Sequence, residues 1–268
     1  IKADFPIYYC LQCNIDTVYK MCHKCYIPAV KKYFCKQCGV IDKESCIHGN
    51  AKTYASREIN INEYLEAALK RLQTRNYPDL IKGVRGTSNK DHIPENLIKG
   101  IIRARHDVYV NKDGTIRFDM SELPITHFKP KEIGTSVERL HQLGYSYDIH
   151  GKELVQENQV LELMTQDIIL PASKEALDET SYEVLFRVAN FVDDLLQDFY
   201  KLPPYYNLTS KQDLVGQLVL ALAPHISSGM VGRIIGFSKT QAMFAHPLFH
   251  ASLRRDCFAY DTMLPIYN

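Results

Sequence analysis

Seven cysteines lie within residues 10–46, and this cluster constrains the fold more than any other feature of the 268-residue chain. Six of them form three Cys-x-x-Cys pairs, and the seventh belongs to a Cys-x-His group. A gap of two residues lets two thiolates bind one ion, and two such pairs complete a tetrahedral zinc site. A region of roughly forty residues builds too small a core to fold unaided. We therefore expect bound metal to stabilise it.

The simplest assignment gives two structural zinc sites in which protein fills all four ligand positions. The first would use Cys10, Cys13, Cys22 and Cys25. The second would use Cys35, Cys38, Cys46 and His48. Cys-x-His is an unusual knuckle, and interleaved pairing of the groups is an alternative. Disulfides would require an oxidising compartment, and a redox role suits three consecutive pairs less well than metal binding.

Composition places the chain among ordinary soluble proteins, with 46% hydrophobic and 24% charged residues. No apolar run is long enough to span a bilayer, and no signal peptide is present. We therefore expect no membrane partner and a cytoplasmic location. The net charge of +1 means that any nucleic-acid surface must be local.

One such local surface is predicted near the C-terminal end, where residues 214–255 contain no Asp or Glu. The stretch carries Arg233, Lys239, Arg254 and Arg255. Cations among apolar residues suit a half-buried surface that faces a polyanion. A buried β segment with scattered surface bases is the alternative.

A second cationic region follows a helix predicted around residues 62–76, with Asn62 as its cap. Residues 82–105 contain six cationic residues and only two acidic ones, and Gly83 and Gly86 mark turns. The cations are Lys82, Arg85, Lys90, Lys99, Arg103 and Arg105. A glycine-bearing cationic loop can approach a phosphate backbone closely, although a solvated surface loop has the same composition.

The rest of the chain predicts an α+β body. Residues 108–118 alternate around a turn and suggest a hairpin, residues 136–143 a helix ended by Gly144, and residues 145–171 two or three strands. Residues 181–200 are expected to form a helix whose three aspartates, Asp193, Asp194 and Asp198, make a solvated face rather than a metal site. Residues 213–222 suggest a further helix.

The C-terminal motifs carry a family resemblance. Pro224-His-Ile-Ser-Ser-Gly-Met-Val-Gly-Arg-Ile-Ile-Gly-Phe237 is followed by Ala245-His-Pro-Leu-Phe-His-Ala251 and Arg254-Arg-Asp-Cys257. These segments closely resemble the large, catalytic subunit of the archaeal family D DNA polymerases. Lys82-Gly-Val and Lys99-Gly-Ile also resemble that family, which has clustered cysteine pairs upstream too.

The resemblance implies a replicative DNA-directed DNA polymerase that acts on primer–template DNA with Mg²⁺. It implies a heterodimer with a small subunit that carries the 3′–5′ exonuclease site, with a sliding clamp as a further partner. The implied catalytic core is a pair of double-psi β-barrels, to which residues 203–256 would contribute. Arg254 and Arg255 would contact DNA beside the metals, and Asp256 would be a candidate metal ligand. The other DNA-contacting residues would be Arg233, Lys239, Lys82, Arg85, Arg103 and Arg105.

The chain departs from the family directly after Cys257. Phe258-Ala-Tyr-Asp-Thr262 stands where the family has the metal-binding Asp-Gly-Asp-Glu-Asp. Two Mg²⁺ ions need converging carboxylates, so this chain alone is expected to be inactive. Residues 257–268 resemble the beginning of an intein, with Cys257 as the splicing nucleophile. A degenerate paralogue, an engineered knockout and an ordinary tail are alternatives.

We therefore interpret the chain as an internal fragment with four parts. Residues 1–50 would be zinc knuckles, 51–202 a mixed DNA-facing domain, 203–256 part of the catalytic barrel, and 257–268 the intein start. A zinc-dependent nucleic-acid-binding module without catalysis is the rival interpretation.

Overall fold

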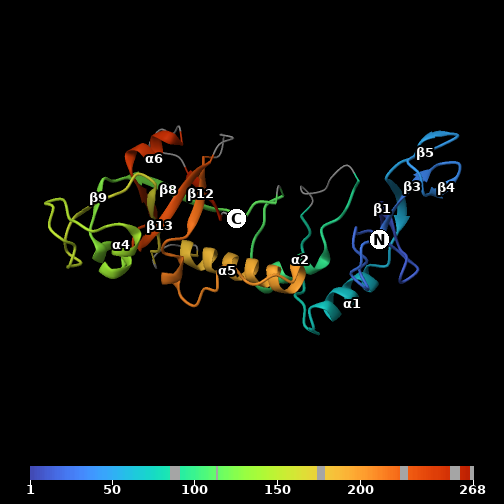
Figure 1. The fold of residues 1–268 in the computed structure, drawn as a ribbon, viewed down its shortest axis with the longest axis horizontal. Helices are drawn as coiled ribbons and strands as arrows, with labels where there is room; N and C mark the ends of the chain where they lie inside the picture. The colour runs from blue at the N-terminus through green and yellow to red at the C-terminus, as the bar shows by residue number, and fades with distance from the viewer. Residues whose placement is uncertain (85–90, 113, 174–178, 224–228, 254–259, 266–268) are drawn as a thin grey trace. The chain divides into compact units, whose positions relative to one another are not determined.

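A computed structural model describes residues 1–84, 91–112, 114–173, 179–223, 229–253 and 260–265, the last range by its backbone (Figure 1). The chain forms two compact units. Unit 1 comprises Ile1–Gly114 and Asp194–Pro203, and unit 2 comprises Thr115–Asp193 and Pro204–Asn268. Among the described residues, no helix is both long and apolar enough to cross a membrane.

Unit 1 is built on a five-stranded antiparallel sheet around the long strand β1 (Lys2–Cys10). The first half of β1 pairs with β7 (Tyr54–Glu58), and its second half pairs with β2 (Ile15–Thr17) and β3 (Val30–Cys35). Strand β4 (Gly39–Ile41) extends the sheet from β3. A separate small hairpin joins β5 (Ser45–Cys46) and β6 (Gly49–Asn50). This arrangement places β1 and β3 so that each ends at a cysteine.

Two α-helices belong to unit 1, together with the π-helical segment Leu195–Tyr200. Helix α1 (Ile61–Arg71) begins after Asn60, whose side chain accepts the Asn62 N–H, so the cap lies two residues before the predicted one. Helix α2 (Leu97–Arg105) is capped in the same way by Asn96. Phe5, Val18, Tyr19 and Tyr64 form a small core between sheet and helix. Strands β2, β4, β5 and β6 are only two or three residues long, so we expect this end of the sheet to depend on other cross-links.

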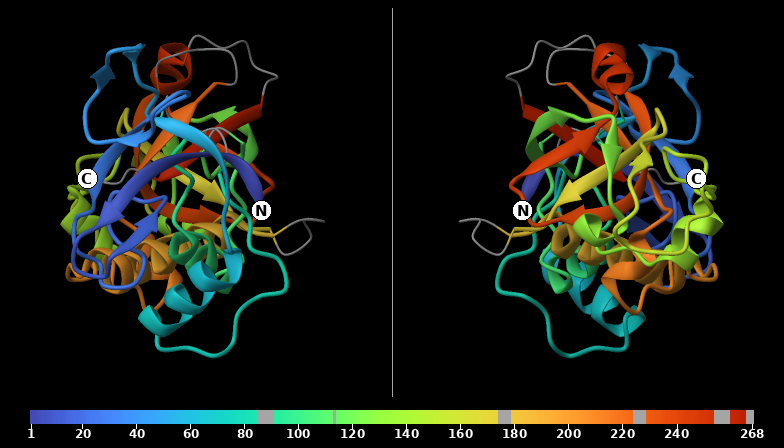
Figure 2. Two further views of the ribbon diagram at one scale, coloured as in Figure 1. Left: turned by 90° about the vertical axis from the view of Figure 1, so that its right-hand side faces the viewer. Right: turned by 90° about the vertical axis from the view of Figure 1, so that its left-hand side faces the viewer.

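Unit 2 contains a closed six-stranded barrel with the strand order β11-β13-β12-β15-β8-β14 (Figures 1 and 2). Its strands are β8 (Phe118–Pro124), β11 (Asp167–Pro171), β12 (Leu218–Leu222), β13 (Met230–Ser238), β14 (Ala242–Ala245) and β15 (Tyr260–Pro265). The pairs β11/β13 and β8/β14 are parallel, and the other four are antiparallel. The mixed α/β class predicted from the sequence is confirmed.

Alternation along β11 and β13 separates two cores. Ile168 and Ile234 join the barrel interior, which α5 (Ser181–Asp194) covers with Leu185 and Ala189. Ile169 and Ile235 face the other way and meet a second core. That core is contributed by β9 (His127–Phe128), α3 (Pro130–Ile133), α4 (Val137–Leu143) and β10 (Leu161–Glu162). Alternate side chains of each strand point to opposite faces of the sheet and therefore pack into two different cores.

Several local expectations are confirmed. Helix α4 begins after Ser136, which accepts the Arg139 N–H, and ends at Gly144 with a left-handed φ of 104°. The long helix at 181–200 is present as α5 and a π-helical continuation, η2 (Leu195–Tyr200).

Other expectations are wrong. Residues 213–222 contain only the end of a short 3₁₀ turn, η3 (Lys211–Leu214), and strand β12. A turn does form where Gly114 N–H donates to Asn111 O, yet the first strand in this region begins at Phe118. The expected 108–118 hairpin is therefore not formed in the described residues.

The three aspartates of the predicted solvated face differ in environment. Asp193 is buried, and its carboxylate accepts the backbone N–H groups of Tyr205, Tyr206 and Asn207 at 2.7–2.9 Å. Asp194 contacts His106 at 2.7 Å. The expectation of a solvated face is therefore wrong for Asp193, which fixes the turn after Pro203-Pro204.

Candidate metal centres and nucleic-acid interface

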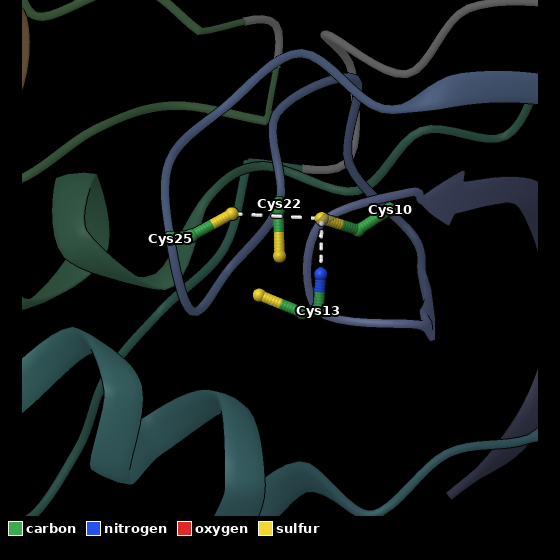
Figure 3. Close-up of side chains that lie close together, drawn as sticks. All are labelled: Cys10, Cys13, Cys22 and Cys25. Carbon is green, nitrogen blue, oxygen red and sulfur yellow. Dashed lines mark hydrogen bonds between the residues drawn. The ribbon is translucent and has the colours of Figure 1, made fainter.

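Four thiols of unit 1 converge on one point. The Sγ atoms of Cys10, Cys13, Cys22 and Cys25 all lie within 4.8 Å of one another (Figure 3). Cys10 stands at the end of β1, and Cys10 and Cys22 are fully buried. Four sulfurs at this separation can surround a single ion.

A second group lies where β3, β4 and the β5–β6 hairpin end. It consists of Cys35, Cys38, Cys46 and His48, whose ligand atoms again lie within 4.8 Å of one another. His48 directs Nδ1 at the three sulfurs, at 3.1 Å from Cys38, 3.7 Å from Cys46 and 3.9 Å from Cys35. Successive groups along the chain thus come together, as in the simplest assignment and not in an interleaved one.

The three Cys-x-x-Cys pairs share a backbone feature that sequence spacing did not reveal. The residue after each second cysteine adopts a left-handed conformation: Asn14 at φ 54°, Tyr26 at φ 58° and Gly39 at φ 76°. Such a residue turns the chain back after the knuckle. Asn and Gly accept this conformation readily, whereas Tyr26 holds it against its own preference, with Arg71 4.5 Å above its ring centroid.

Backbone donors prepare one thiol of each group for metal binding. The Cys13 N–H donates to Cys10 Sγ at 3.4 Å and lowers the pKa of Cys10 to about 7. Backbone N–H groups of Cys38 and Gln37 lower the pKa of Cys35 to about 6. The pKa of Cys38 is raised to about 11, chiefly by burial. A bound cation would replace the protons on the thiols that are still protonated. Four sulfurs, or three sulfurs and one imidazole nitrogen, are donor sets that zinc binds.

The predicted DNA-contacting cations fall into three sets. Arg85, Arg254 and Arg255 lie outside the described residues, as do Asp256 and Cys257. Lys82, Arg105 and Lys239 are exposed. Arg103 and Arg233 are engaged with carboxylates inside the protein. Sequence composition could not separate these sets.

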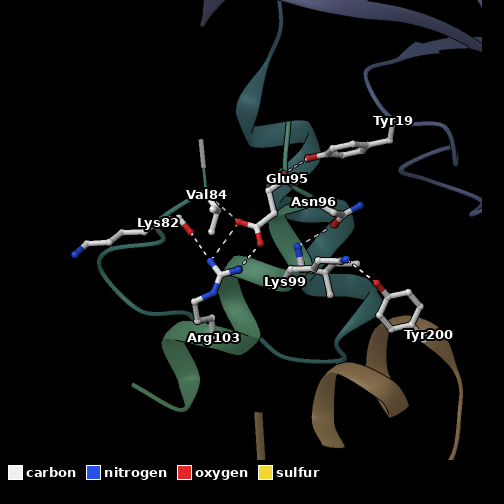
Figure 4. Close-up of polar contacts among 9 residues, drawn as sticks. Tyr19, Lys82, Val84, Glu95, Asn96, Lys99, Arg103 and Tyr200 are labelled. Atoms are coloured by element: carbon white, nitrogen blue, oxygen red, sulfur yellow. Dashed lines mark hydrogen bonds and ion pairs between the residues drawn. The ribbon is translucent and has the colours of Figure 1, made fainter. Parts of the chain in front are cut away.

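Arg103 joins helix α2 to the preceding loop (Figure 4). Its guanidinium contacts both carboxylate oxygens of Glu95 and donates to Lys82 O at 3.2 Å. Glu95 in turn accepts the Val84 N–H at 2.9 Å. The Arg103 and Glu95 side chains are only 8% and 12% exposed. This pair holds the loop against α2.

Arg233 joins two parallel barrel strands. Its Nε and an Nη each donate to Asp167 at 2.8 Å, and Tyr145 Oη donates to the same carboxylate at 2.6 Å. Asp167 is 3% exposed at the side chain. The bond to Asp167 raises the pKa of Arg233, and burial raises the pKa of Tyr145. The geometry gives Arg233 a role in holding β13 to β11.

A partly buried pair that sequence reasoning missed involves His250 of the Ala-His-Pro-Leu-Phe-His-Ala motif. His246 caps helix α6 (Pro247–Ser252) by accepting the Leu248 N–H at 3.1 Å. His250 contacts the Glu122 carboxylate on β8, and their side chains are 13% and 8% exposed. The only signal in the sequence was that the two histidines flank Pro247 at helical spacing. The pair fixes α6 to the barrel.

The described residues contain no candidate Mg²⁺ site. Among them, the two cysteine groups are the sets of three or more His, Cys, Asp or Glu residues that could hold a metal. A two-Mg²⁺ centre requires converging carboxylates, and the described residues bring no such set together.

Comparisons with known proteins show which family this chain resembles. Residues 73–264 match the family model described as DNA polymerase II large subunit DP2, catalytic domain. The DNA polymerase II large subunit of Archaeoglobus fulgidus is 47% identical over 260 residues, which cover 96% of this chain and 22% of that protein. The corresponding proteins of Nanoarchaeum equitans and Pyrococcus abyssi are 41% and 44% identical, each over 98% of this chain.

This chain spans only about a fifth of the length of these relatives, with 24% of the Nanoarchaeum protein and 18% of the Pyrococcus protein covered. The alignments with these relatives nevertheless include most of both units of this chain. The chain therefore belongs to the DNA polymerase II large subunit family.

Proposed function

We propose that this chain is part of the catalytic subunit of an archaeal replicative DNA polymerase, which extends a primer by template-directed nucleotidyl transfer. The family match over residues 73–264 carries the proposal. The closed six-stranded barrel with two parallel pairs supports a double-psi barrel core. In the intact enzyme, Mg²⁺ would supply charge stabilisation at the transferred phosphate.

The two cysteine groups of unit 1 are proposed to hold structural zinc. All four positions of each group are filled by protein donors, which leaves none for a substrate or water. Their role would be to hold in place the two- and three-residue strands β2, β4, β5 and β6 around them.

The remaining partners follow from the family. We propose a heterodimer with a small subunit that contributes 3′–5′ exonuclease activity, and a sliding clamp as a further partner. Residues 257–268 are proposed to begin an intein, with Cys257 as its nucleophile, on the resemblance of Cys257-Phe-Ala-Tyr-Asp-Thr262. Ligation of the flanking segments in a longer protein that carries the downstream sequence would support this, and an unspliced product would oppose it.

Lys239 provides the test of DNA contact. It is exposed in the turn between β13 and β14. We expect Lys239→Ala to weaken duplex binding about two- to fivefold and to reduce the salt slope of the binding constant by about one. Lys152→Ala, which removes an exposed lysine from another loop of unit 2, is the matched control. Fluorescence anisotropy over a salt series measures both, and equal effects of the two variants would oppose a specific interface.

The rival function, a zinc-dependent nucleic-acid-binding module without catalysis, also predicts DNA binding. It would apply if residues 257–268 are an ordinary tail, because Phe258 and Tyr260 would then stand in place of the acidic cluster that the family resemblance implies. Only nucleotide incorporation separates the two functions.

A further inference from the structure

A cavity of about 310 Å³ lies in unit 1 where helix α2 meets the loops on either side of it. Apolar walls come from Pro78, Leu80 and Val108, and Gly100 and Arg103 contribute from α2. This volume is at the lower end of the range of about 300–1,000 Å³ for small-molecule sites. It is suited to a planar group such as a nucleobase.

The wall of this cavity is fixed in place. At Gly100 a Cβ would lie 2.8 Å from the Ile81 side chain and 3.1 Å from Lys82 O, so glycine allows the loop to sit against the helix. The Arg103 guanidinium then binds Lys82 O, and Glu95 binds the Val84 N–H (Figure 4). A cavity held by a buried ion pair requires little reorganisation to accept a ligand.

The rim combines an aromatic ring with a cation. Tyr109 is 71% exposed, an unusual state for a tyrosine that lines a cavity. Lys82 Nζ lies 5.4 Å from the centre of its ring, and Figure 4 shows the Lys82 side chain directed away from Arg103. Asp107 also lines the cavity and offers a hydrogen-bond acceptor.

We propose that this cavity binds an unpaired base of single-stranded DNA, with the base stacked on Tyr109 and the adjacent phosphate near Lys82. The inference rests on the proposed polymerase function, which supplies single-stranded template as a ligand. An exposed aromatic beside a cation is the combination that binds single strands with little sequence preference. The Asp107 carboxylate can accept a hydrogen bond from an exocyclic amino group of the base.

The test compares Tyr109→Ala with Tyr109→Phe in this chain. The alanine variant is expected to bind a short oligodeoxycytidine at least about fivefold more weakly, because a stacking partner is lost. Phenylalanine keeps the ring and is expected to bind within about twofold of the unsubstituted chain. Duplex affinity should be unchanged in both. Tyr147→Ala removes a tyrosine of similar exposure, 66%, from unit 2 and is the matched control.

Photocrosslinking gives a second readout. An oligonucleotide that contains 5-iododeoxyuridine should crosslink to the peptide that carries Tyr109. Equal single-strand affinity for Tyr109→Ala and the unsubstituted chain, or crosslinks only elsewhere, would overturn the base pocket. If that result is obtained while the chain still binds duplex DNA and Lys239→Ala weakens duplex binding, the base pocket is overturned but the proposed function is not. If the chain binds neither single-stranded nor duplex DNA, both the base pocket and the proposed function are overturned.

Discussion

Cys22→Ser is expected to reduce the zinc content of the chain from two ions to one and to unfold much of unit 1. Cys22 is fully buried in the first group, and zinc contributes about 10–16 kcal/mol to the folding of small domains of this kind. The three-residue strand β2, which lies between the two knuckles of this group, cannot replace that contribution by its own pairing. We expect a loss above about 4 kcal/mol, beyond the effect of most single substitutions.

Metal analysis by mass spectrometry and hydrogen exchange of β1, β2 and α1 would measure both effects. Cys46→Ser should also remove one ion, but with a smaller loss of protection, since the second group is more exposed and lies on short strands. Cys257→Ser is the control and should retain both ions. Retention of both ions by Cys22→Ser, with hydrogen exchange of unit 1 unchanged, would contradict the assignment of Cys22 to a structural zinc site.

Arg233→Met is expected to destabilise unit 2 by about 3–5 kcal/mol, because it leaves the Asp167 carboxylate buried without its cation. The methionine occupies similar space, so little of this loss would come from packing. Tyr145 Oη would remain as one donor to the carboxylate. Urea unfolding followed by circular dichroism gives the free-energy difference.

The double variant Arg233→Met/Asp167→Leu separates charge from packing. Replacement of a whole buried ion pair by apolar groups is often nearly neutral, so the double variant should recover most of the lost stability. Lys239→Ala, in the exposed turn that follows β13, should change stability by less than about 0.5 kcal/mol. Unchanged stability of Arg233→Met with weakened DNA binding would show that Arg233 contacts phosphate instead.

Sequence reasoning succeeded where the governing interactions are local. The spacing of Cys10 and Cys13 determines which atoms can share an ion, and Ser136 and Gly144 mark the ends of α4 by hydrogen bonds within a few residues. Helix α5 was found for the same reason, since its apolar stripe repeats along one segment.

The failures share a dependence on distant partners. Residues 218–222 are rich in Leu and Ala and favour a helix. They form β12 because β13 and β15 pair with them on either side, and Gly216 at φ 98° ends the preceding turn. Likewise Arg233 looked like a surface cation because its partner Asp167 is 66 residues away. Tertiary pairing decided both outcomes.

Primer extension tests the central claim most directly. The full-length large subunit that contains this chain would be prepared with its small subunit in two versions. One carries Cys257→Ala, so that Phe258 and Tyr260 are retained without splicing, and the other has Cys-Asp-Gly-Asp-Glu-Asp in place of the whole proposed intein that begins at Cys257. We predict no incorporation by the first version and template-directed, Mg²⁺-dependent extension by the second. A folded, zinc-loaded and DNA-binding second version that adds no nucleotide would contradict the proposed polymerase function.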